Sequence, residues 1–213
     1  MREGIMILIG QFDSSFVRRV GIALTLYDIP FEHRPWSVFG DAGRLAAFNP
    51  LTKVPTLVLD DGEVLVDSHL IIDHLDTLVE PARRLYPTAE PARRRALKVA
   101  ALATGLADVG VSLFYEKHLH ADASEMLVAR RSAQLLGALA ALETDRAGRA
   151  SPFWFGETIG HADIAVACAL RHMRESLPEI VDLQACPHLA AHAERMEALP
   201  AFRTIFQPFV PPS

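Results

Sequence analysis

Residues 49–75, NPLTKVPTLVLDDGEVLVDSHLIIDHL, constrain the fold more than any other stretch of this sequence. Residues 56–59 form a short apolar run rich in residues that favour strands, and residues 60–62, Asp-Asp-Gly, are a hairpin signal. The apolar residues 64–66 supply the second arm of the hairpin. From residue 67 onward, leucines and isoleucines recur at helical spacing. The stretch therefore predicts a strand, a tight turn, a second strand and an amphipathic helix, in that order.

Two features of this stretch suit the binding of a small anion. Pro55 stands directly before the first predicted strand, and Asp67 and Ser68 stand where the helix begins. Aspartate and serine favour a helix N-terminus, where free backbone N–H groups and the helix dipole attract negative charge. A proline before one strand and a helix N-terminus just after the hairpin are an arrangement suited to a peptide-like anion.

The residues before this stretch predict a strand, a helix and a second strand. Residues 5–9 form a continuous apolar run, which is typical of a strand buried on both faces of a sheet. Residues 10–15 supply turn residues and possible helix caps, and residues 16–27 place their apolar side chains on one helical face. Residues 29–30, Ile-Pro, end that helix, and residues 31–34 alternate as a strand does. With an irregular region holding a short helix before residue 49, this is a thioredoxin-like order, in which a ligand binds at the carboxyl end of the first strand.

Beyond residue 80 the pattern changes to helices alone. Residues 80–91, which contain several prolines and arginines, form the best domain boundary. The segments with helical periodicity are residues 92–120, 124–146 and 161–177, followed by short helices that begin at Pro187 and Pro200. The sequence therefore predicts a thioredoxin-like α/β domain over residues 1–80 and an all-α helical-bundle domain over residues 88–213.

Length and composition exclude several classes of protein. A chain of 213 residues, half of them hydrophobic, is long enough to bury a proper core. Its formal net charge of −5 is not that of a nucleic-acid-binding protein. Lys98 and Asp108 interrupt the best candidate for a membrane span, and the run at residues 5–9 is too short for the core of a signal peptide. We therefore expect a soluble cytoplasmic protein with no nucleic-acid or membrane partner.

The cysteines and histidines predict neither a disulfide framework nor a metal site. Cys168 lies in a run of alanine, valine and leucine, as a core thiol does. Cys186 stands before a proline, where we expect exposure but no basic neighbour to make the thiol reactive. His188 and His192 lie four residues apart on an expected helix, but such pairs are common by chance and no cysteine pair joins them. We expect no bound metal.

The order of NPLTKVP, a hairpin and DSHLII resembles the glutathione-binding half of the glutathione S-transferase superfamily. The resemblance implies a cis bond between Val54 and Pro55, with Val54 offering its backbone to the cysteinyl part of glutathione. It also implies that Asp67 and Ser68 hold the γ-glutamyl end, with Lys53 adjoining the site. On residue type alone, Lys53 fits a solvated loop charge, and the Asp-Ser pair fits a simple helix cap.

The segment GQFDSSFVRRVGIAL, residues 10–24, is similar to the bacterial transferase pattern Ser-Pro-Phe-Val-Arg-Lys, with Ser15 in place of the proline. The resemblance implies that the Ser14 hydroxyl activates the thiol of glutathione. The alternative is that Ser14 or Ser15 only caps the helix, and both roles can coexist. Arg18 and Arg19 are expected to turn away from the apolar face. No cysteine stands in this region, which argues against the cysteine-dependent branches of the family.

The second half extends the resemblance. FGETIGHADIAVACAL, residues 155–170, looks like the family's capping segment, with Gly160 at the capping position and Asp163 as its partner. Glycine is a tolerable helix cap, but it offers no hydroxyl in return. The resemblance also implies a site for an electrophile between the domains, walled by the helix over residues 92–120 near Phe114 and Tyr115.

The function implied by the resemblance is a detoxifying glutathione transferase. Such an enzyme binds glutathione as co-substrate, stabilises its thiolate and directs it at a small electrophile. A glutathione-dependent peroxidase or isomerase on the same site is an alternative, as is a non-catalytic glutathione-binding regulatory protein. Members of the family usually form homodimers, so we also expect a homodimer.

Overall fold

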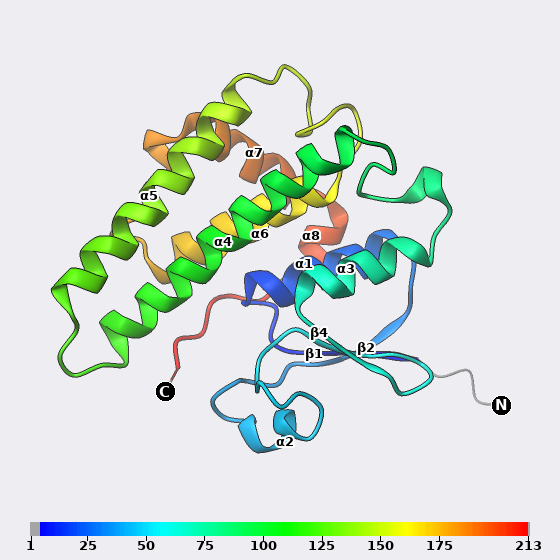
Figure 1. Ribbon diagram of the computed structural model, residues 1–213, viewed down its shortest axis with the longest axis horizontal. Coiled ribbons are helices and arrows are strands. Elements are labelled where there is room, and N and C mark those ends of the chain that lie inside the picture. Colours follow the sequence, from blue (N-terminus) through cyan, green and yellow to red (C-terminus); the bar gives the residue numbers. More distant parts are fainter. Residues whose placement is uncertain (1–4, 213) are drawn as a thin grey trace. The chain divides into compact units, whose positions relative to one another are not determined.

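The computed structural model describes residues 5–212 and divides the chain into two compact units (Figure 1). The first unit comprises the residues up to Leu85 together with the C-terminal segment from Pro200, and the second unit spans Tyr86–Leu199. The sequence prediction assigned residues 200–213 to the helical domain, whereas the structure groups them with the α/β unit. The assignment of glutathione binding to one domain and of the electrophile wall to the other stays a prediction.

A four-stranded mixed sheet with strand order β2-β1-β3-β4 forms the centre of the first unit (Figure 1). Its strands are β1 (Met6–Ile9), β2 (Phe31–Arg34), β3 (Thr56–Val58) and β4 (Val64–Val66). β1 runs parallel to β2 and antiparallel to β3, and β3 pairs antiparallel with β4 across the hairpin. A parallel pair needs a crossover connection, which α1 (Ser15–Leu26) supplies. The predicted thioredoxin-like order is confirmed.

Helices cover both faces of this sheet. α1 packs against α3 (Ser68–Thr77) on one side, and the short α2 (Ala42–Ala46) lies on the other (Figure 1). Leu45 of α2 is fully buried against Ile9 of β1 and Val58 of β3. Burying a leucine side chain contributes about 1.5–3 kcal/mol, so this contact anchors a helix of only five residues. A turn of 3-10 helix, η1 (Pro81–Arg83), follows α3.

The C-terminal segment belongs to the first unit because α1 holds it with a buried arginine. Arg18 is 1% exposed, donates from Nε to the Ile205 carbonyl at 2.8 Å, and donates from Nη2 to the Phe202 carbonyl at 2.9 Å. Its guanidinium also lies over the Phe202 ring. Phe202 belongs to α8 (Pro200–Thr204). A buried charge is costly unless it is hydrogen-bonded, so these contacts explain why residues 200–205 pack on α1. The expectation that Arg18 turns away from the apolar face is wrong.

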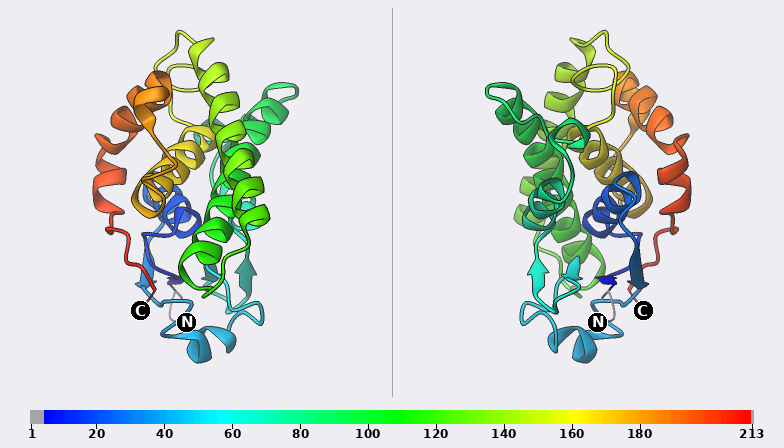
Figure 2. Two further views of the ribbon diagram at one scale, coloured as in Figure 1. Left: turned by 90° about the vertical axis from the view of Figure 1, so that its left-hand side faces the viewer. Right: turned by 90° about the vertical axis from the view of Figure 1, so that its right-hand side faces the viewer.

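The second unit is a bundle of helices. Its elements are α4 (Ala92–His118), α5 (Glu125–Ala147), α6 (His161–Ser176), η2 (Leu183–Ala185) and α7 (Pro187–Glu197). α4 packs against both α5 and α6, and α7 packs against α5 and α6 (Figure 2). Nearly every residue of α6 is buried, as its apolar sequence predicted. The predicted all-α bundle is confirmed.

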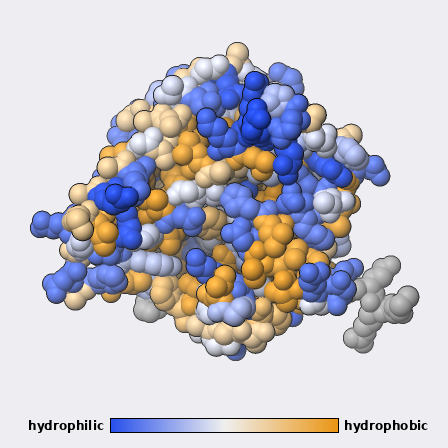
Figure 3. Space-filling view, viewed as in Figure 1, coloured by the Kyte–Doolittle hydropathy of each residue, from blue (hydrophilic) through white to orange (hydrophobic). Residues whose placement is uncertain are grey.

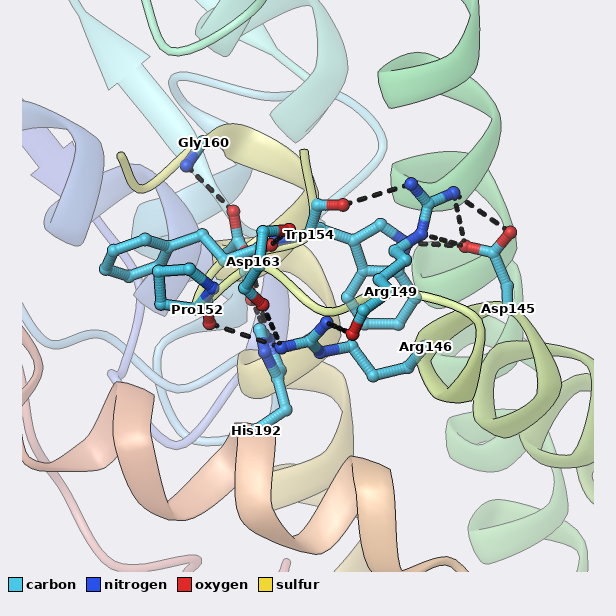
Figure 4. Close-up of polar contacts among 10 residues, drawn as sticks. Asp145, Arg146, Arg149, Pro152, Trp154, Gly160, Asp163 and His192 are labelled. Carbon is cyan, nitrogen blue, oxygen red and sulfur yellow. Dashed lines mark hydrogen bonds and ion pairs between the residues drawn. The ribbon is translucent and has the colours of Figure 1, made fainter. Parts of the chain in front are cut away.

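The start of α6 is held by one aspartate. Asp163 accepts the Gly160 N–H at 2.9 Å and the Trp154 N–H at 2.7 Å (Figure 4). In a full capping box the side chain of the first residue would also accept the Asp163 N–H, but Gly160 has no side chain, so only the Asp163 half of the box is formed. The Trp154 bond uses the second carboxylate oxygen, so Asp163 ties the preceding loop to the helix as well. Arg146 supports the same loop through the carbonyls of Ser151 and Pro152.

Cys186 differs from the sequence expectation. The residue precedes α7 directly and is buried rather than exposed, with 9% of its surface accessible. Burial raises the pKa of the Cys186 thiol, and the nearby carboxylates of Glu143 and Asp182 raise it further. Cys168 is buried in α6, as predicted.

In the part of the chain that the structure describes, α4 is the single helix long and apolar enough to cross a membrane by length and composition. Half of its most apolar window is buried, and it packs against α5 and α6. Core helices of globular units pass the same test, so the finding is weak evidence for a span. The sequence analysis expected Lys98 and Asp108 to rule out a membrane span in this segment. By length and composition alone they do not.

Candidate functional site

Ser14 lies where β1 has ended and α1 begins. It is the N-cap of α1, and its Oγ accepts the Val17 N–H at 3.4 Å. The bond is long, and a hydroxyl that accepts still has a proton to donate. Ser14 is partly exposed, whereas the neighbouring Ser15 is buried. The capping role is therefore real, and it leaves the Ser14 proton available to a ligand.

Gly10 brings the turn that carries Ser14 against the segment before β3. Its φ is +129°, a conformation that L side chains rarely adopt. A Cβ there would lie 2.5 Å from Val17 Cγ2 and 2.8 Å from Val54 Cβ. Both distances are too short for real atoms, so only glycine fits. The structure thus places Val54 beside the first turn of α1.

Asn49 fixes the turn that leads to Val54. Its buried side chain donates from Nδ2 to the Lys53 carbonyl at 2.9 Å and to Thr56 Oγ1 at 3.1 Å. Its Oδ1 accepts the Leu51 N–H at 2.9 Å. The bond between Val54 and Pro55 within this turn is cis, and the Lys53 side chain is exposed. Asn49 stood in the stretch that the sequence analysis singled out, but its supporting role depends on a folded turn and was missed.

Asp67 and Ser68 lie where β4 turns into α3. Asp67 is the N-cap of α3, and its Oδ1 accepts the His69 N–H at 2.7 Å. Its backbone has φ 71° and ψ 128°. A non-glycine residue in such a sparsely populated region costs on the order of 1–3 kcal/mol, and residues of this kind cluster at ligand sites. Asp67 is exposed, so its carboxylate is open to solvent.

Ser68 meets a buried arginine that the sequence analysis expected on the surface. Arg19 and Ser68 are 1% and 2% exposed, and Arg19 Nη1 donates to Ser68 Oγ at 3.2 Å. The charge of Arg19 also lowers the pKa of His69, although burial of that imidazole is the larger cause. The expectation that Arg19 turns away is wrong, because the contact between α1 and α3 encloses the guanidinium.

Arg19 has hydrogen-bonding capacity that its neighbours do not use. Its Nε and Nη2 are buried and have no hydrogen-bond partner among the described residues. The Ser15 hydroxyl is in the same position. An unmatched buried guanidinium is costly, so an anionic acceptor at the start of α3 would be strongly favoured. Two adjacent arginines in a helical pattern predict a solvated face, so no sequence signal distinguished Arg19.

Phe114 and Tyr115 lie on α4 in the second unit. Phe114 is buried and Tyr115 is half-buried, and their rings meet edge to face at 6.2 Å. Phe114 also contacts the His118 ring at 4.4 Å. The first unit thus gathers Ser14, Val54 and Ser68 around α1 and the start of α3, while the two aromatic residues belong to the other unit.

No group of three or more possible metal ligands lies together within residues 5–212. A small cavity of about 90 Å³ in the second unit is lined by Arg146, Arg149, His188, Ala191, His192 and Arg195. None of the residues predicted to bind glutathione lines it. Asp145 pairs with Arg149, and loop carbonyls engage Arg146 (Figure 4). We therefore regard Arg146 and Arg149 as supports of the loop before α6, whose carbonyls they bind.

Comparisons with known proteins agree on one family. A profile described as "Glutathione S-transferase, N-terminal domain" matches residues 8–83, and one described as "Glutathione S-transferase, C-terminal domain" matches residues 125–195. The chain is 32% identical over 169 residues to "Uncharacterized GST-like protein YibF" of Escherichia coli (strain K12). That match covers 79% of this chain and 82% of the relative.

Two further similarities bear on chemistry. The chain is 34% identical over 103 residues to the maleylacetoacetate isomerase of Pseudomonas aeruginosa, covering 46% of this chain and 48% of that protein. Its structure matches a glutathione S-transferase of Methylobacterium radiotolerans, determined in complex with glutathione sulfonate, with a TM-score of 0.90 and 26% identity. That match covers 98% of this chain and 97% of the other.

Proposed function

Because the chain belongs to the glutathione S-transferase superfamily, we propose that it is a transferase that adds the thiolate of glutathione to small electrophiles. Glutathione is the co-substrate, and the structural relative that holds glutathione sulfonate supports this choice. Ser14 would stabilise the thiolate. Asp67 and Ser68 would hold the γ-glutamyl end.

The observation that carries the proposal is the pair of Arg19 and Ser68. No carboxylate among residues 5–212 pairs with the buried Arg19 guanidinium, which leaves a positive charge beside the α3 N-terminus, where the helix dipole also favours an anion. The γ-glutamyl end of glutathione carries a carboxylate, whose negative charge is opposite to that of the Arg19 guanidinium. Ser68 can donate to that carboxylate while it accepts from Arg19. The remaining positions, Lys53 and Val54, would contact the rest of the peptide.

Isothermal calorimetry of glutathione binding tests this proposal. Ser68→Ala should weaken binding about tenfold or more, because charge-assisted hydrogen bonds contribute roughly 1.5–3 kcal/mol. Arg19→Leu should weaken binding at least as much, since it removes the charge. Ser132→Ala, on α5 in the other unit, is the matched serine control and should bind like the wild type. Unchanged affinity in both site variants would show that the γ-glutamyl end binds elsewhere.

An isomerase is a second candidate, favoured by the similarity to maleylacetoacetate isomerase. In that reaction the thiolate would add to a double bond and then leave, so the same Ser14 and Ser68 would serve. A panel of electrophiles, hydroperoxides and a substrate with a cis double bond conjugated to a carbonyl distinguishes transferase, peroxidase and isomerase. Glutathione binding without turnover of any of them would indicate a binding or regulatory protein. Phe114 and Tyr115 stay our candidates for contacting the second substrate.

We also propose that the protein is a homodimer. The first unit exposes several large hydrophobic side chains, and a space-filling view shows hydrophobic residues gathered over its strands (Figure 3). Among the described residues of this unit, Leu51 is the most exposed large hydrophobic residue, at 65%. Apolar surface of this kind marks protein–protein contacts. Light scattering should give about twice the chain mass of 23.4 kDa, and a value near 23.4 kDa would reject the dimer.

A further inference from the structure

The C-terminal segment lies against the loop that carries Ser14. The Phe12 N–H donates to Gln207 Oε1 at 3.1 Å, and the Val210 N–H donates to Asp13 Oδ2 at 3.2 Å. Both partners belong to the first unit, where the segment coloured red passes the start of α1 (Figure 1). The two residues immediately before Ser14 are therefore both bound by the end of the chain.

The same segment is also held one helical turn after Ser14. Arg18 binds the Ile205 carbonyl, so contacts to the C-terminal segment stand on both sides of the serine. Gly21 allows this close packing, because a Cβ there would lie 2.8 Å from Phe12 Cε1 and 3.0 Å from Ile205 Cγ2. The loop, α1 and the C-terminal segment thus pack without spare room.

On the side of the sheet the loop is fixed by aromatic stacking. The Phe12 ring stacks on the His33 ring, with centroids 3.8 Å apart and planes 12° apart. The His33 Nε2 lies 2.8 Å from the Gly10 carbonyl. Ser14 itself donates its N–H to the Gln11 carbonyl at 3.2 Å. The position of Ser14 is therefore set between His33 on one side and the C-terminal segment on the other.

Beyond the buried Ile205, the segment depends more on hydrogen bonds than on core packing. Phe206 and Val210 expose 54% and 56% of their surface, so residues 206–210 do not form a hydrophobic core of their own. Gln207 is half-buried and accepts a backbone N–H that belongs to the loop. Removing that one acceptor should leave α1 and the Arg18 contacts in place, because Arg18 binds the carbonyls of Phe202 and Ile205 independently of Gln207.

We propose that residues 205–210 form a C-terminal strap that positions Ser14 toward the thiol of glutathione, with Gln207 as the positioning residue. The inference rests on the proposed function of Ser14. A displacement of about 1 Å at a reacting group can lower a rate about a hundredfold. The loop before Ser14 is held by Gln207, by Val210 and by the His33 ring, so it is suited to keeping the Ser14 hydroxyl in place. Within the described part of the chain, the hydrogen bonds of the strap given above involve Phe12, Asp13 and Arg18 rather than Arg19 or Ser68, so losing the strap should affect thiol activation more than glutathione affinity.

Three variants test the strap. Gln207→Leu removes the acceptor for the Phe12 N–H, Gln207→Glu keeps an acceptor oxygen at the same distance, and Gln134→Leu makes the same chemical change at an exposed site on α5. For each protein, calorimetry gives glutathione affinity and ultraviolet titration of the thiolate gives the pKa of the bound thiol. The rate of conjugation to an aromatic halide is then measured against pH.

We expect Gln207→Leu to raise the thiol pKa by about half to one pH unit and to lower kcat about three- to tenfold at neutral pH, with partial recovery at high pH. Its glutathione affinity should stay within about twofold of the wild type. Gln207→Glu keeps the acceptor but adds a negative charge that itself raises the thiol pKa, so its kcat should return to the wild-type value at high pH, whereas that of Gln207→Leu recovers only in part. Gln134→Leu should behave like the wild type. If the wild type binds glutathione and Gln207→Leu has the same thiol pKa and kcat as the wild type, the strap proposal is wrong and the proposed function still stands. Equal loss of affinity and activity in both Gln207 variants overturns it too, because that pattern indicates a general folding role. A wild type that binds no glutathione refutes both proposals.

Discussion

At the scale of single residues, Ser14 and Ser15 occupy different surroundings although they are neighbours of the same type. Ser14 is partly exposed and bonds weakly to the Val17 N–H, whereas the Ser15 hydroxyl is buried without a partner among the described residues. A ligand can reach the first without disturbing packing. Ser15 occupies the first helical position, where proline is well tolerated because its missing N–H is not needed. Having Ser15 in place of the pattern's proline therefore changes the first residue of α1 and leaves the partly exposed Ser14 hydroxyl unchanged.

We predict that Ser14→Ala raises the pKa of the bound glutathione thiol by roughly one unit or more. A free thiol with pKa near 8.5 is only a few per cent ionised at neutral pH, and a hydroxyl that donates to the anion favours ionisation. Turnover at neutral pH should fall while glutathione affinity changes less, and raising the pH should restore part of the rate. Ser15→Ala is the matched control. If Ser15→Ala shifts the ultraviolet titration and Ser14→Ala does not, the role belongs to Ser15.

The sequence allowed the candidate residues to be named but not their buried supports. Ser14, Val54 and Ser68 stand in motifs whose order along the chain resembles a known family. Arg19 and Asn49 act only after folding, because the contact of α1 with α3 encloses the guanidinium and the turn before β3 organises the amide. A charged residue on a helix is usually solvated, so periodicity assigned Arg19 to the wrong face.

At the scale of elements, the contact between α4 and α6 depends on a glycine. Gly110 lies in the middle of α4, and a Cβ there would lie 1.9 Å from Met173 Sδ. Gly105 lies on the same helix, and a Cβ there would meet nothing within 4 Å. Both glycines lower the intrinsic helix propensity equally, but only the first one permits close packing. Helix periodicity predicted α4 itself, whereas close approach between helices has no signal in a single sequence.

We predict opposite effects on stability for the two glycine-to-alanine changes. Gly105→Ala should stabilise the protein by about 0.5–1 kcal/mol, because alanine is the better helix former. Gly110→Ala should destabilise it by about 1–3 kcal/mol, because the methyl group forces Met173 to move within a packed interior. Urea unfolding of the two variants measures the difference, and the Met173→Ala change should partly rescue Gly110→Ala. Similar stabilisation by both changes would contradict the close contact.

Element order and type could be predicted well, and the placement of the chain's end could not. Apolar runs, turn residues and helical periodicity gave the four strands and the long helices within a few residues of their observed bounds. Residues 200–213 carry short helical and proline-rich patterns that fit either domain. What assigns them to the first unit is the buried Arg18 and its two carbonyl partners, Phe202 and Ile205. Such a long-range contact is set by packing rather than by local sequence.

At the scale of the whole molecule, two buried groups should have opposing effects on how stability depends on pH. Burial lowers the pKa of His192 to about 4, and the charges of Arg146 and Arg195 act in the same direction. Burial raises the pKa of Asp163 to about 6, although its bonds to backbone N–H groups and the charge of Arg146 lower it in part. The two residues are neighbours, with His192 Nε2 3.4 Å from the Asp163 carbonyl oxygen.

The signs follow from which state holds more protons. Between pH about 4 and 6, folded Asp163 keeps a proton that the unfolded chain has released, so its contribution to stability falls as the pH rises. Over nearly the same range the unfolded chain keeps a proton on His192 that the folded protein has released, so this contribution rises with pH. The two slopes therefore offset each other in the wild type.

We predict that His192→Leu leaves the decrease in unfolding free energy with rising pH that Asp163 contributes without the opposing contribution of His192. At about 1.4 kcal/mol for each unit of pKa difference, the free energy of unfolding of this variant should fall relative to wild type by roughly 2–3 kcal/mol between pH 4 and 6. Asp163→Asn removes the opposite slope, so its stability should rise relative to wild type over the same range. His74→Leu, at a histidine on α3 in the first unit, is the control for the same chemical change away from Asp163. Urea unfolding at closely spaced pH values gives the curves, and parallel curves for all four proteins would show that neither buried group titrates differently on folding.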